Sequence, residues 1–474
     1  MRTWRTKLCT FGALIITLSL ISPATTNATT TKATLATYQS QKLNWKSCGN
    51  DLQCTTVKVP VDYEAIDGNS FTLAVVRHLA SDKKNKVGTL FVNPGGPGGS
   101  AYNYAAAASQ IVSKKIVQRF DILGFDPRGV GRSQPTRCLT DKEEDKYIAA
   151  DIAVLTKADL NALLAAAKYF ASACEKAAGA KIGHFGSLEA AKDMNLIRTL
   201  LKEPKLNYLG KSYGTFLGTL YAALYPTTVG KFVLDGAIDP NATNAEMNLT
   251  QAVGFETALL DYSKKTKIFS QDDIVAFLNS LRTNPMSLPN GRRLTPSIAI
   301  IAIASTLYEN TSGWPDLTKA LDAAINNEDA RPLFDLADAY NMRDASGRYS
   351  TENDMAQIIS CLDLAEPRTV AQMTQSGIAM KKKAPVFGPY LTYAGLTCKY
   401  WKHAVSKKPA MKIIKTAPVI IIGVSKDPAT PYAWAVNLHK IFTGSTLITF
   451  NGDGHTGHNR GSSCVDNRVD SYLL

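Results

Sequence analysis

The sequence predicts an α/β fold in which one large, mostly parallel sheet is covered by helices on both faces. Strand-like and helix-like segments alternate along much of the chain, as they do in folds of this class. Several of the strand-like segments are continuous apolar runs, which are typical of strands buried on both faces. The strand-like segments lie at 71–79, 87–93, 120–125, 206–209, 231–234, 418–424 and 446–450. Helical patterns at 188–201, 215–224 and 432–442 separate some of them, so crossover helices are expected to join parallel strands.

The alternation stops over 239–416, an interval rich in Ala and Leu with helix-like segments and no comparable strand. At 474 residues the chain is longer than a usual single core, so an insertion or a second domain is expected. We expect a helical cap over 239–416, inserted between two parts of a sheet core at 45–238 and 417–474. A cap over the carboxyl end of the sheet would close a site there and select its substrate. An independent helical domain is the alternative.

The N-terminal residues predict export. Three cations, at Arg2, Arg5 and Lys7, precede an apolar run at 11–21 and small residues up to Ala28, which is the pattern of a secretory signal peptide at 1–28. A membrane anchor is the alternative, but the run is shorter than the ~20 residues of a spanning helix. Residues 29–44 are rich in Thr, Ala, Ser and Gln and are expected to form a flexible lead. The mature protein would then be secreted or associated with the cell surface.

Seven of the eight cysteines follow this leader, and in an exported protein they should largely be paired. Proximity in the sequence predicts three pairs and one remaining thiol: Cys48 with Cys54, Cys138 with Cys174, Cys361 with Cys398, and Cys464 alone.

The charge pattern indicates no specific anionic partner. Removing the three leader cations lowers the formal net charge from +13 to +10, and the remaining Lys and Arg residues are spread along the chain. This spread favours a solubilising role, although a basic exported protein could associate loosely with anionic cell-wall surfaces. No zinc-finger spacing, basic helix or interleaved aromatic motif points to nucleic acid.

The pentapeptide Gly210-Lys211-Ser212-Tyr213-Gly214 lies between an apolar strand pattern and a helical pattern. Gly-x-Ser-x-Gly in this position is typical of a nucleophile elbow, a tight turn that presents the serine hydroxyl at the carboxyl end of a strand. The pentapeptide alone is a weak signal, so its partners decide whether Ser212 is a nucleophile.

A serine nucleophile needs a base, and the base needs an acid that fixes its tautomer. His455 lies in a glycine-rich loop directly after the strand-like segment 446–450, whereas His439 falls inside a helical pattern. We favour His455 as the base over its neighbour His458. Asp427 follows the strand-like segment 418–424 and is our candidate acid. Asp453 is the competing acid, but it lies only two residues from the base, too near to reach the far ring nitrogen.

The oxyanion of a tetrahedral intermediate requires backbone donors. One candidate is the amide of Tyr213, directly after Ser212. The other is Gly96, in the glycine-rich turn 93–100 that follows the strand-like segment 87–93. A phosphate cradle is the alternative for this turn, but Pro97 lacks an N–H donor and no Walker pattern is present.

These motifs together resemble the secreted tripeptidyl aminopeptidases of actinobacteria, which are α/β-hydrolases related to the prolyl aminopeptidases. The resemblance extends from about residue 45 to the C-terminus and is looser in the cap. It rests on six segments in order: 93–100, 126–133, 210–214, 233–237, 427–431 and 454–456.

The resemblance implies a nucleophile Ser212, an acid Asp427 and a base His455, with no metal or cofactor. It also implies short peptide substrates with a free N-terminus and an anion for the substrate ammonium. Relatives use cap glutamates for this purpose, so Glu256 is the first candidate and Asp363 the second. A carboxylesterase with the same triad is the alternative enzyme. A catalytically silent surface protein on a hydrolase scaffold is the alternative outside enzymes.

Overall fold

The computed structural model describes residues 33–403, 405–412 and 414–474. The expected signal peptide at 1–28 lies outside these residues. Within them, nine strands form one sheet in the order β1-β2-β3-β5-β4-β6-β7-β11-β13. The strands from β5 through β4, β6, β7 and β11 to β13 run parallel, while β1, β2 and β3 form an antiparallel edge. The predicted large, mostly parallel sheet is therefore confirmed.

The strands of this sheet are β1 (Lys46–Gly49), β2 (Leu52–Pro60), β3 (Ser70–His78), β4 (Gly88–Asn93), β5 (Phe120–Phe125), β6 (Leu206–Lys211), β7 (Val229–Asp235), β11 (Val419–Lys426) and β13 (Thr446–Asp453). The two strands at the antiparallel edge, β1 and β2, were not expected from the sequence pattern. Two short pairs lie apart from the sheet: β8 (Met286–Ser287) with β9 (Arg293–Leu294), and β10 (Ile414–Lys415) with β12 (Phe442–Thr443).

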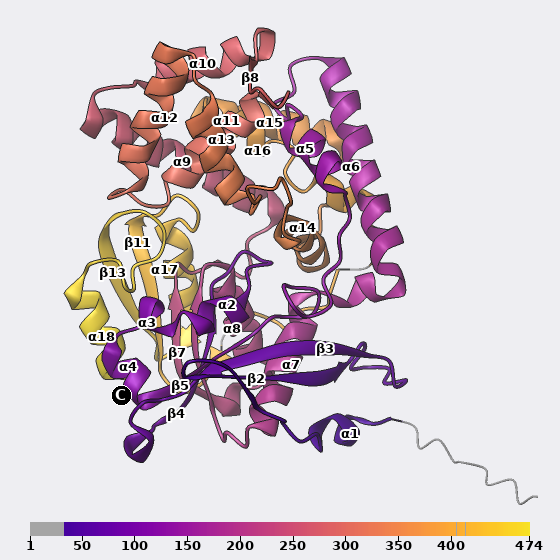
Figure 1. Ribbon diagram of the computed structural model, residues 1–474, viewed down its shortest axis with the longest axis vertical. Coiled ribbons are helices and arrows are strands. Elements are labelled where there is room, and N and C mark those ends of the chain that lie inside the picture. Colours follow the sequence, from indigo (N-terminus) through magenta and orange to yellow (C-terminus); the bar gives the residue numbers. More distant parts are fainter. Residues whose placement is uncertain (1–32, 404, 413) are drawn as a thin grey trace, which may run out of the picture.

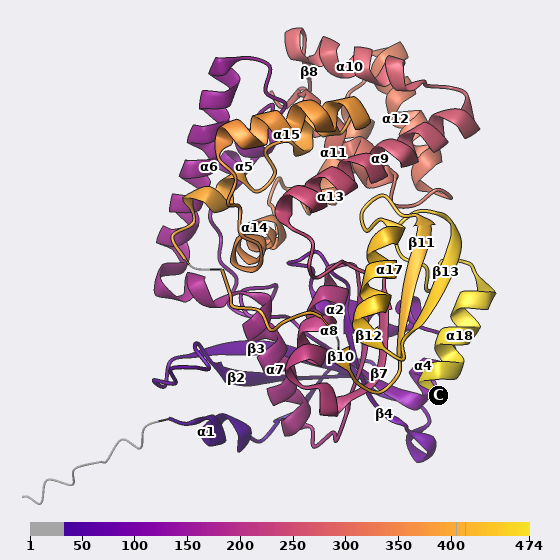
Figure 2. The same ribbon diagram turned by 180° about the vertical axis from the view of Figure 1, so that it is seen from behind.

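Helices cover both faces of the sheet (Figures 1 and 2). One face packs against α7 (Ser187–Leu200), α8 (Tyr213–Leu224) and α17 (Tyr432–Ile441), whose apolar side chains form a core with those of the strands. The other face packs against α2 (Ala101–Ala106), α3 (Ala108–Ile111), α4 (Lys114–Arg119) and α18 (Ser463–Leu473). Because both faces are covered, the strands β4 and β5 are buried along their whole length.

A layer of helices lies over the carboxyl end of the parallel strands (Figure 1). From the expected insertion it contains α9 (Asn244–Thr266), α10 (Gln271–Thr283), α11 (Pro296–Thr306), α12 (Gly313–Asn327), α13 (Arg331–Tyr340), α14 (Glu352–Asp363), α15 (Val370–Lys383) and α16 (Gly388–Leu391). Many of these helices share a hydrophobic core of their own.

Two helices from the earlier part of the chain join this layer, α5 (Asp141–Ala149) and α6 (Lys157–Ala178). Ile148 and Ile152 pack against the core of the helical layer, which also contains Ala153. The layer is thus larger than the interval 239–416, because a second excursion of the chain leaves the sheet after β5 and returns before α7. Short 3-10 helices occur at Lys83–Asn85, Gly179–His184, Pro226–Thr228 and Leu396–Tyr400.

The chain preceding β1 differs from the expected flexible lead. Residues 35–39 form the short helix α1 (Leu35–Gln39), and the Tyr38 side chain is buried in the core beneath it. Gln41 binds the backbone of Lys58 through both ends of its amide, at 2.7 and 2.8 Å. The apolar ring of Tyr38 and these bonds hold the described part of the lead against the sheet.

The three predicted disulfides are confirmed, and Cys464 is an exposed free thiol. Among the described helices, none combines the length and the apolar character that crossing a membrane requires.

Candidate active site

Ser212 occupies a sharp turn between β6 and α8. Its backbone has φ 53° and ψ −123°, a conformation that non-glycine residues rarely adopt and that is found at strained functional turns. A Cβ at Gly210 would lie 2.5 Å from the carbonyl oxygen of Gly214, and one at Gly214 would lie 2.9 Å from Oδ1 of Asn93. Both glycines are therefore required sterically, and the turn has the geometry of the predicted elbow.

Asp427 and His455 lie in neighbouring loops at the ends of the paired strands β11 and β13. The imidazole Nδ1 of His455 is 2.9 Å from each carboxylate oxygen of Asp427, whose side chain is fully buried. The Asp427 carboxylate also accepts hydrogen bonds from the amides of Ala429 and Thr430, at 2.9 and 2.8 Å, and from the Thr430 hydroxyl at 2.9 Å. These donors hold the carboxylate in place, and the contact through Nδ1 leaves Nε2 of His455 free of Asp427.

Tyr308, which follows α11, holds the histidine from the side of the helical layer. Its carbonyl oxygen accepts the backbone N–H of His455 at 2.9 Å, and the two rings meet edge to face with centroids 5.3 Å apart. Tyr308 was not predicted from the sequence, because no local pattern reveals a contact between segments 147 residues apart.

The rival residues His458, Asp453 and His439 lie in different surroundings. His458 is buried, and burial together with nearby Lys211 lowers the pKa of His458 to about 3. A group that resists protonation so strongly is poorly matched to proton transfer near neutral pH. Asp453 forms ion pairs with Lys265 at 2.6 Å and Lys426 at 3.7 Å. His439 in α17 bonds Ser445 at 2.7 Å.

The glycine-rich turn after β4 packs directly on the elbow. A Cβ at Gly95 would lie 2.7 Å from the carbonyl oxygen of Lys211 and 2.9 Å from Cβ of Ser212, so only glycine fits. The next residue, Gly96, lines the same cavity as Ser212 and Tyr213. The turn thus brings its backbone beside the serine.

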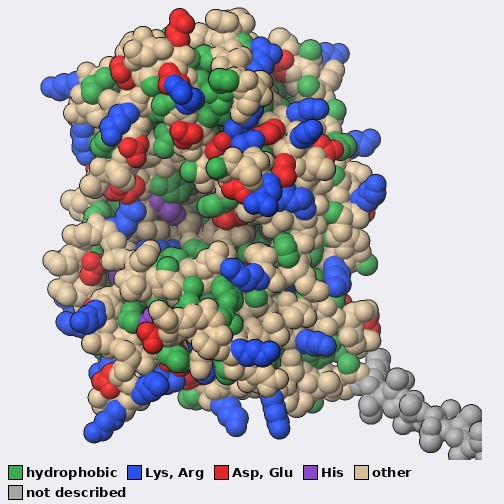
Figure 3. Space-filling model, viewed as in Figure 1, with side chains coloured by type: hydrophobic (Ala, Val, Ile, Leu, Met, Phe, Trp, Pro, Cys, Tyr) green, Lys and Arg blue, Asp and Glu red, His purple; other side chains and the backbone are tan. Residues whose placement is uncertain are grey.

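This reaction cavity has a volume of about 230 Å³ and lies between the end of the sheet and the helical layer. The molecular surface is hollowed between these two layers, with a histidine side chain on the wall of the hollow (Figure 3). Residues of both layers line the cavity. The sheet layer provides Phe216 and Ile238, and the helical layer provides Met247, Gln251 and Ser360.

Of the two predicted carboxylates, Asp363 lines this cavity and Glu256 does not. Both Asp363 oxygens accept hydrogen bonds from Ser187, one from its amide at 2.9 Å and one from its hydroxyl. Burial raises the pKa of Asp363 to about 6. Asp363 is therefore present in the wall, with both oxygens already engaged.

The expectation for Glu256 needs correction. Glu256 is buried in α9, where one carboxylate oxygen accepts the amides of Val386 and Phe387 at 3.0 and 3.1 Å and the other accepts the side chain of Gln271. These bonds join α9 to the chain before α16, so the carboxylate faces the interior of the helical layer and has a packing role.

The sequence interpretation also missed a buried ion pair beneath the elbow. The carboxylate of Asp235, at the end of β7, accepts the amides of Gly457 and His458 at 2.7 and 3.0 Å. Its carbonyl oxygen accepts the amide of Ser212 at 2.9 Å. Lys211 lies 3.7 Å from the same carboxylate and donates to the His458 carbonyl at 2.8 Å. This pair connects the elbow to the loop that carries His455.

Comparison with known proteins identifies the family of this chain. A family model described as the alpha/beta hydrolase fold matches residues 88–291, and one described as TAP-like protein matches residues 384–474. Tripeptidyl aminopeptidase of Streptomyces coelicolor is 32% identical over 461 residues, covering 91% of this chain and 84% of the relative. Serine protease Hip1 of Mycobacterium tuberculosis is 33% identical over 449 residues, covering 89% and 85%. The chain belongs to this family of α/β-hydrolases.

Membership makes the protein a serine hydrolase and confirms the predicted fold class. Relatives of this chain carry the names of different kinds of hydrolase. Carboxylesterase B of Mycobacterium tuberculosis is 33% identical over 511 aligned positions, covering 99% of this chain and 97% of the relative.

Proposed function

We propose that this chain is an exported aminopeptidase that releases short peptides from free peptide N-termini, with Ser212, His455 and Asp427 as its catalytic triad. The observation that carries the proposal is the His455–Asp427 pair, in loops at the same edge of the sheet as a serine held in a strained elbow. The likeness to tripeptidyl aminopeptidases supports peptide substrates. The three disulfides support export, because such bonds persist in oxidising compartments.

The reaction proceeds through an acyl-enzyme. Ser212 Oγ attacks the scissile carbonyl carbon and its proton passes to Nε2 of His455, while Asp427 holds the imidazole tautomer and stabilises the imidazolium. The amides of Gly96 and Tyr213 donate to the oxyanion. The C–N bond then breaks and His455 returns the proton to the leaving amine. Water, deprotonated by His455, attacks the acyl ester and releases the peptide acid and Ser212.

A carboxylesterase is the second candidate, favoured by the relative of that name that aligns along nearly the whole chain. The triad hydrolyses esters and amides through the same steps, so the substrate amine discriminates. An aminopeptidase binds a free ammonium, and an esterase with short acyl substrates does not need one.

The deciding experiment compares kcat/KM for a tripeptide p-nitroanilide with a free amine and for its N-acetylated form. We expect the free form to be cleaved at least tenfold more efficiently. Equal cleavage of both would eliminate the aminopeptidase and leave a general hydrolase. Labelling by a fluorophosphonate probe tests the nucleophile, since it should disappear in Ser212→Ala; labelling that persists would exclude Ser212.

A further inference from the structure

The helix α14 is connected to both segments that carry the proposed oxyanion donors. Its first turn packs on the glycine-rich turn after β4, because a Cβ at Gly98 would lie 2.6 Å from the carbonyl oxygen of Glu352. Its last residue, Asp363, lines the reaction cavity and bonds Ser187 at the start of α7. The helical layer therefore reaches the surroundings of Ser212 through this helix.

A chain of hydrogen bonds links Asp363 to the side chain of Tyr213. The Ser187 hydroxyl donates to Oδ2 of Asp363, and the Tyr213 hydroxyl bonds the Ser187 oxygen. A serine hydroxyl carries one proton, so the Tyr213 O–H is the donor of the second bond. Burial holds the pKa of Tyr213 well above its usual value, so this hydroxyl keeps the proton that it donates. The chain therefore runs from Tyr213 through Ser187 to Asp363.

The carboxylate at the end of this chain has a fixed position. Its Oδ1 accepts the amide of Ser187, the first residue of α7, at 2.9 Å, and Gly186 before it offers no side chain for this purpose. Asp363 thus caps α7, at the helix end where the dipole favours a negative charge. The disulfide Cys361–Cys398 holds the same end of α14.

The other end of the chain belongs to the residue directly after the nucleophile. The Tyr213 side chain is 7% exposed, and among the described residues its hydroxyl bonds Ser187, which is fully buried. A buried ring that is anchored at its far end restricts rotation of the backbone that carries it. The amide of Tyr213 is a proposed oxyanion donor, and such a donor acts only within hydrogen-bond distance of the developing charge. The direction of this N–H therefore depends on the chain to Asp363.

We propose that Asp363 is a positioning residue for the oxyanion hole: through Ser187 and the Tyr213 side chain it directs the Tyr213 amide toward the substrate oxyanion. In the same way α14 supports the glycine-rich turn that carries Gly96. This inference rests on the nucleophile and oxyanion donors of the proposed function, and it applies to peptide and ester substrates alike. The helical layer then takes part in the chemical step as well as in the choice of substrate.

Two variants interrupt the chain without a large change of volume. Tyr213→Phe keeps the ring and removes the hydroxyl. Asp363→Asn keeps the shape of the side chain, but its NH2 group donates to Ser187, whose hydroxyl must then donate to Tyr213. The Tyr213 O–H is left without an acceptor, so the chain is reversed and broken at its end.

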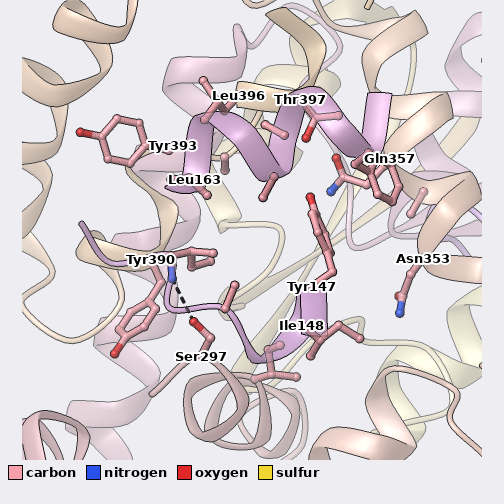
Figure 4. A pocket seen from close by; sticks show the side chains of 18 of the residues that line it. Tyr147, Ile148, Leu163, Ser297, Asn353, Gln357, Tyr390, Tyr393, Leu396 and Thr397 are labelled. Carbon is pink, nitrogen blue, oxygen red and sulfur yellow. Dashed lines mark hydrogen bonds between the residues drawn. The ribbon is translucent and has the colours of Figure 1, made fainter. Parts of the chain in front are cut away.

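Gln357 of the same helix provides a matched control. Its side chain lies with that of Asn353 on the wall of a second cavity, of about 360 Å³, inside the helical layer, where Tyr147 faces it (Figure 4). The described wall of this cavity includes neither Ser212 nor Tyr213. Gln357→Ala therefore changes α14 without altering the chain from Asp363.

The test measures kcat and KM of these variants on a short acyl p-nitrophenyl ester and on free and N-acetylated tripeptide p-nitroanilides. The kcat is expressed per site titrated with a fluorophosphonate probe, so unfolded enzyme does not contribute. We expect Tyr213→Phe and Asp363→Asn each to lower kcat roughly tenfold on every substrate that wild type cleaves, with KM unchanged. This is part of the roughly hundredfold to thousandfold loss that follows removal of an oxyanion donor. Gln357→Ala should keep the wild-type kcat on the ester.

A double variant tests whether the two residues act through one chain. Tyr213→Phe combined with Asp363→Asn should lower kcat about as far as either change alone, and a loss equal to the product of the two would contradict the chain. If Asp363→Asn does not fold, Tyr213→Phe decides by itself.

The remaining outcomes separate this inference from the proposed function. It is wrong if Tyr213→Phe retains kcat within twofold. It is also wrong if Asp363→Asn raises KM for the free-amine peptide alone and spares the ester, since Asp363 would then bind the substrate ammonium. If wild type cleaves free and acetylated peptides equally, the aminopeptidase fails, and the ester assay still decides the role of Asp363.

Discussion

Replacing Asp235 with asparagine is expected to lower kcat without changing KM. The carboxylate accepts two backbone amides, those of Gly457 and His458, just beyond His455. An asparagine side chain can accept one of them, but its NH2 group then faces the other N–H. One buried donor is left unsatisfied, which costs about 1–3 kcal/mol of unfolding free energy. Lys211 loses its buried counter-charge at the same time.

The catalytic effect follows from the position of the loop. In the proposed triad, displacement of the imidazole by about 1 Å can lower the rate roughly a hundredfold, because proton transfer from Ser212 would depend on alignment with His455. We therefore expect kcat for a p-nitrophenyl ester to fall about 10- to 100-fold in Asp235→Asn. The KM should stay the same, because Asp235 does not line the reaction cavity.

A matched control separates positioning from general destabilisation. Asp121 at the start of β5 is also buried and also accepts one backbone amide, from Ala80 at 2.9 Å, and one lysine, Lys86 at 2.9 Å. It lies at the opposite end of the parallel strands, so Asp121→Asn should lose stability through its weakened contact with Lys86 and keep kcat. Both variants are compared by steady-state kinetics and urea unfolding. The reasoning is refuted if Asp235→Asn loses stability but retains kcat within twofold.

Two further predictions concern the surroundings of the site. Gly95→Ala should reduce kcat at least tenfold in ester assays, because its Cβ would press on the Lys211 carbonyl and on Ser212; wild-type kcat in this variant would contradict the packing. For His458, burial and Lys211 lower the folded-state pKa to about 3 from 6.5. The unfolded chain therefore binds more protons between these values, so stability is retained above pH 6.5 and lost progressively as pH falls toward 3. At 1.36 kcal/mol for each pKa unit the loss is on the order of 5 kcal/mol. Urea unfolding at several pH values should show a weaker pH dependence in His458→Phe, and an unchanged one would refute the assignment.

The parts of the site that could be predicted were those attached to strand ends. Ser212, Asp427 and His455 each follow a recognisable apolar run, and parallel strands bring their carboxyl ends to one edge. The glycine-rich turn was predictable for the same reason, because glycines after a strand allow the close approach that Gly95 makes to the elbow.

The cap was predicted less completely. Its helical character is visible in the composition of 239–416, but α5 and α6 join it from the segment between β5 and α7. Their amphipathic patterns are compatible with packing on a sheet or on helices, so local sequence does not specify which surface they cover.

The role of individual carboxylates depends most on tertiary structure. Glu256 lies in the segment that resembles the family, yet its oxygens bind the backbone before α16. Asp363 binds Ser187 only because folding brings together residues that lie 176 positions apart. The sequence by itself determined the sheet, the strand-end loops and the order of the candidate triad, because these follow from local hydrophobic patterns and turn residues. The tertiary structure decided which carboxylates are engaged and which face a cavity, because burial and hydrogen-bond partners arise only when distant segments pack together.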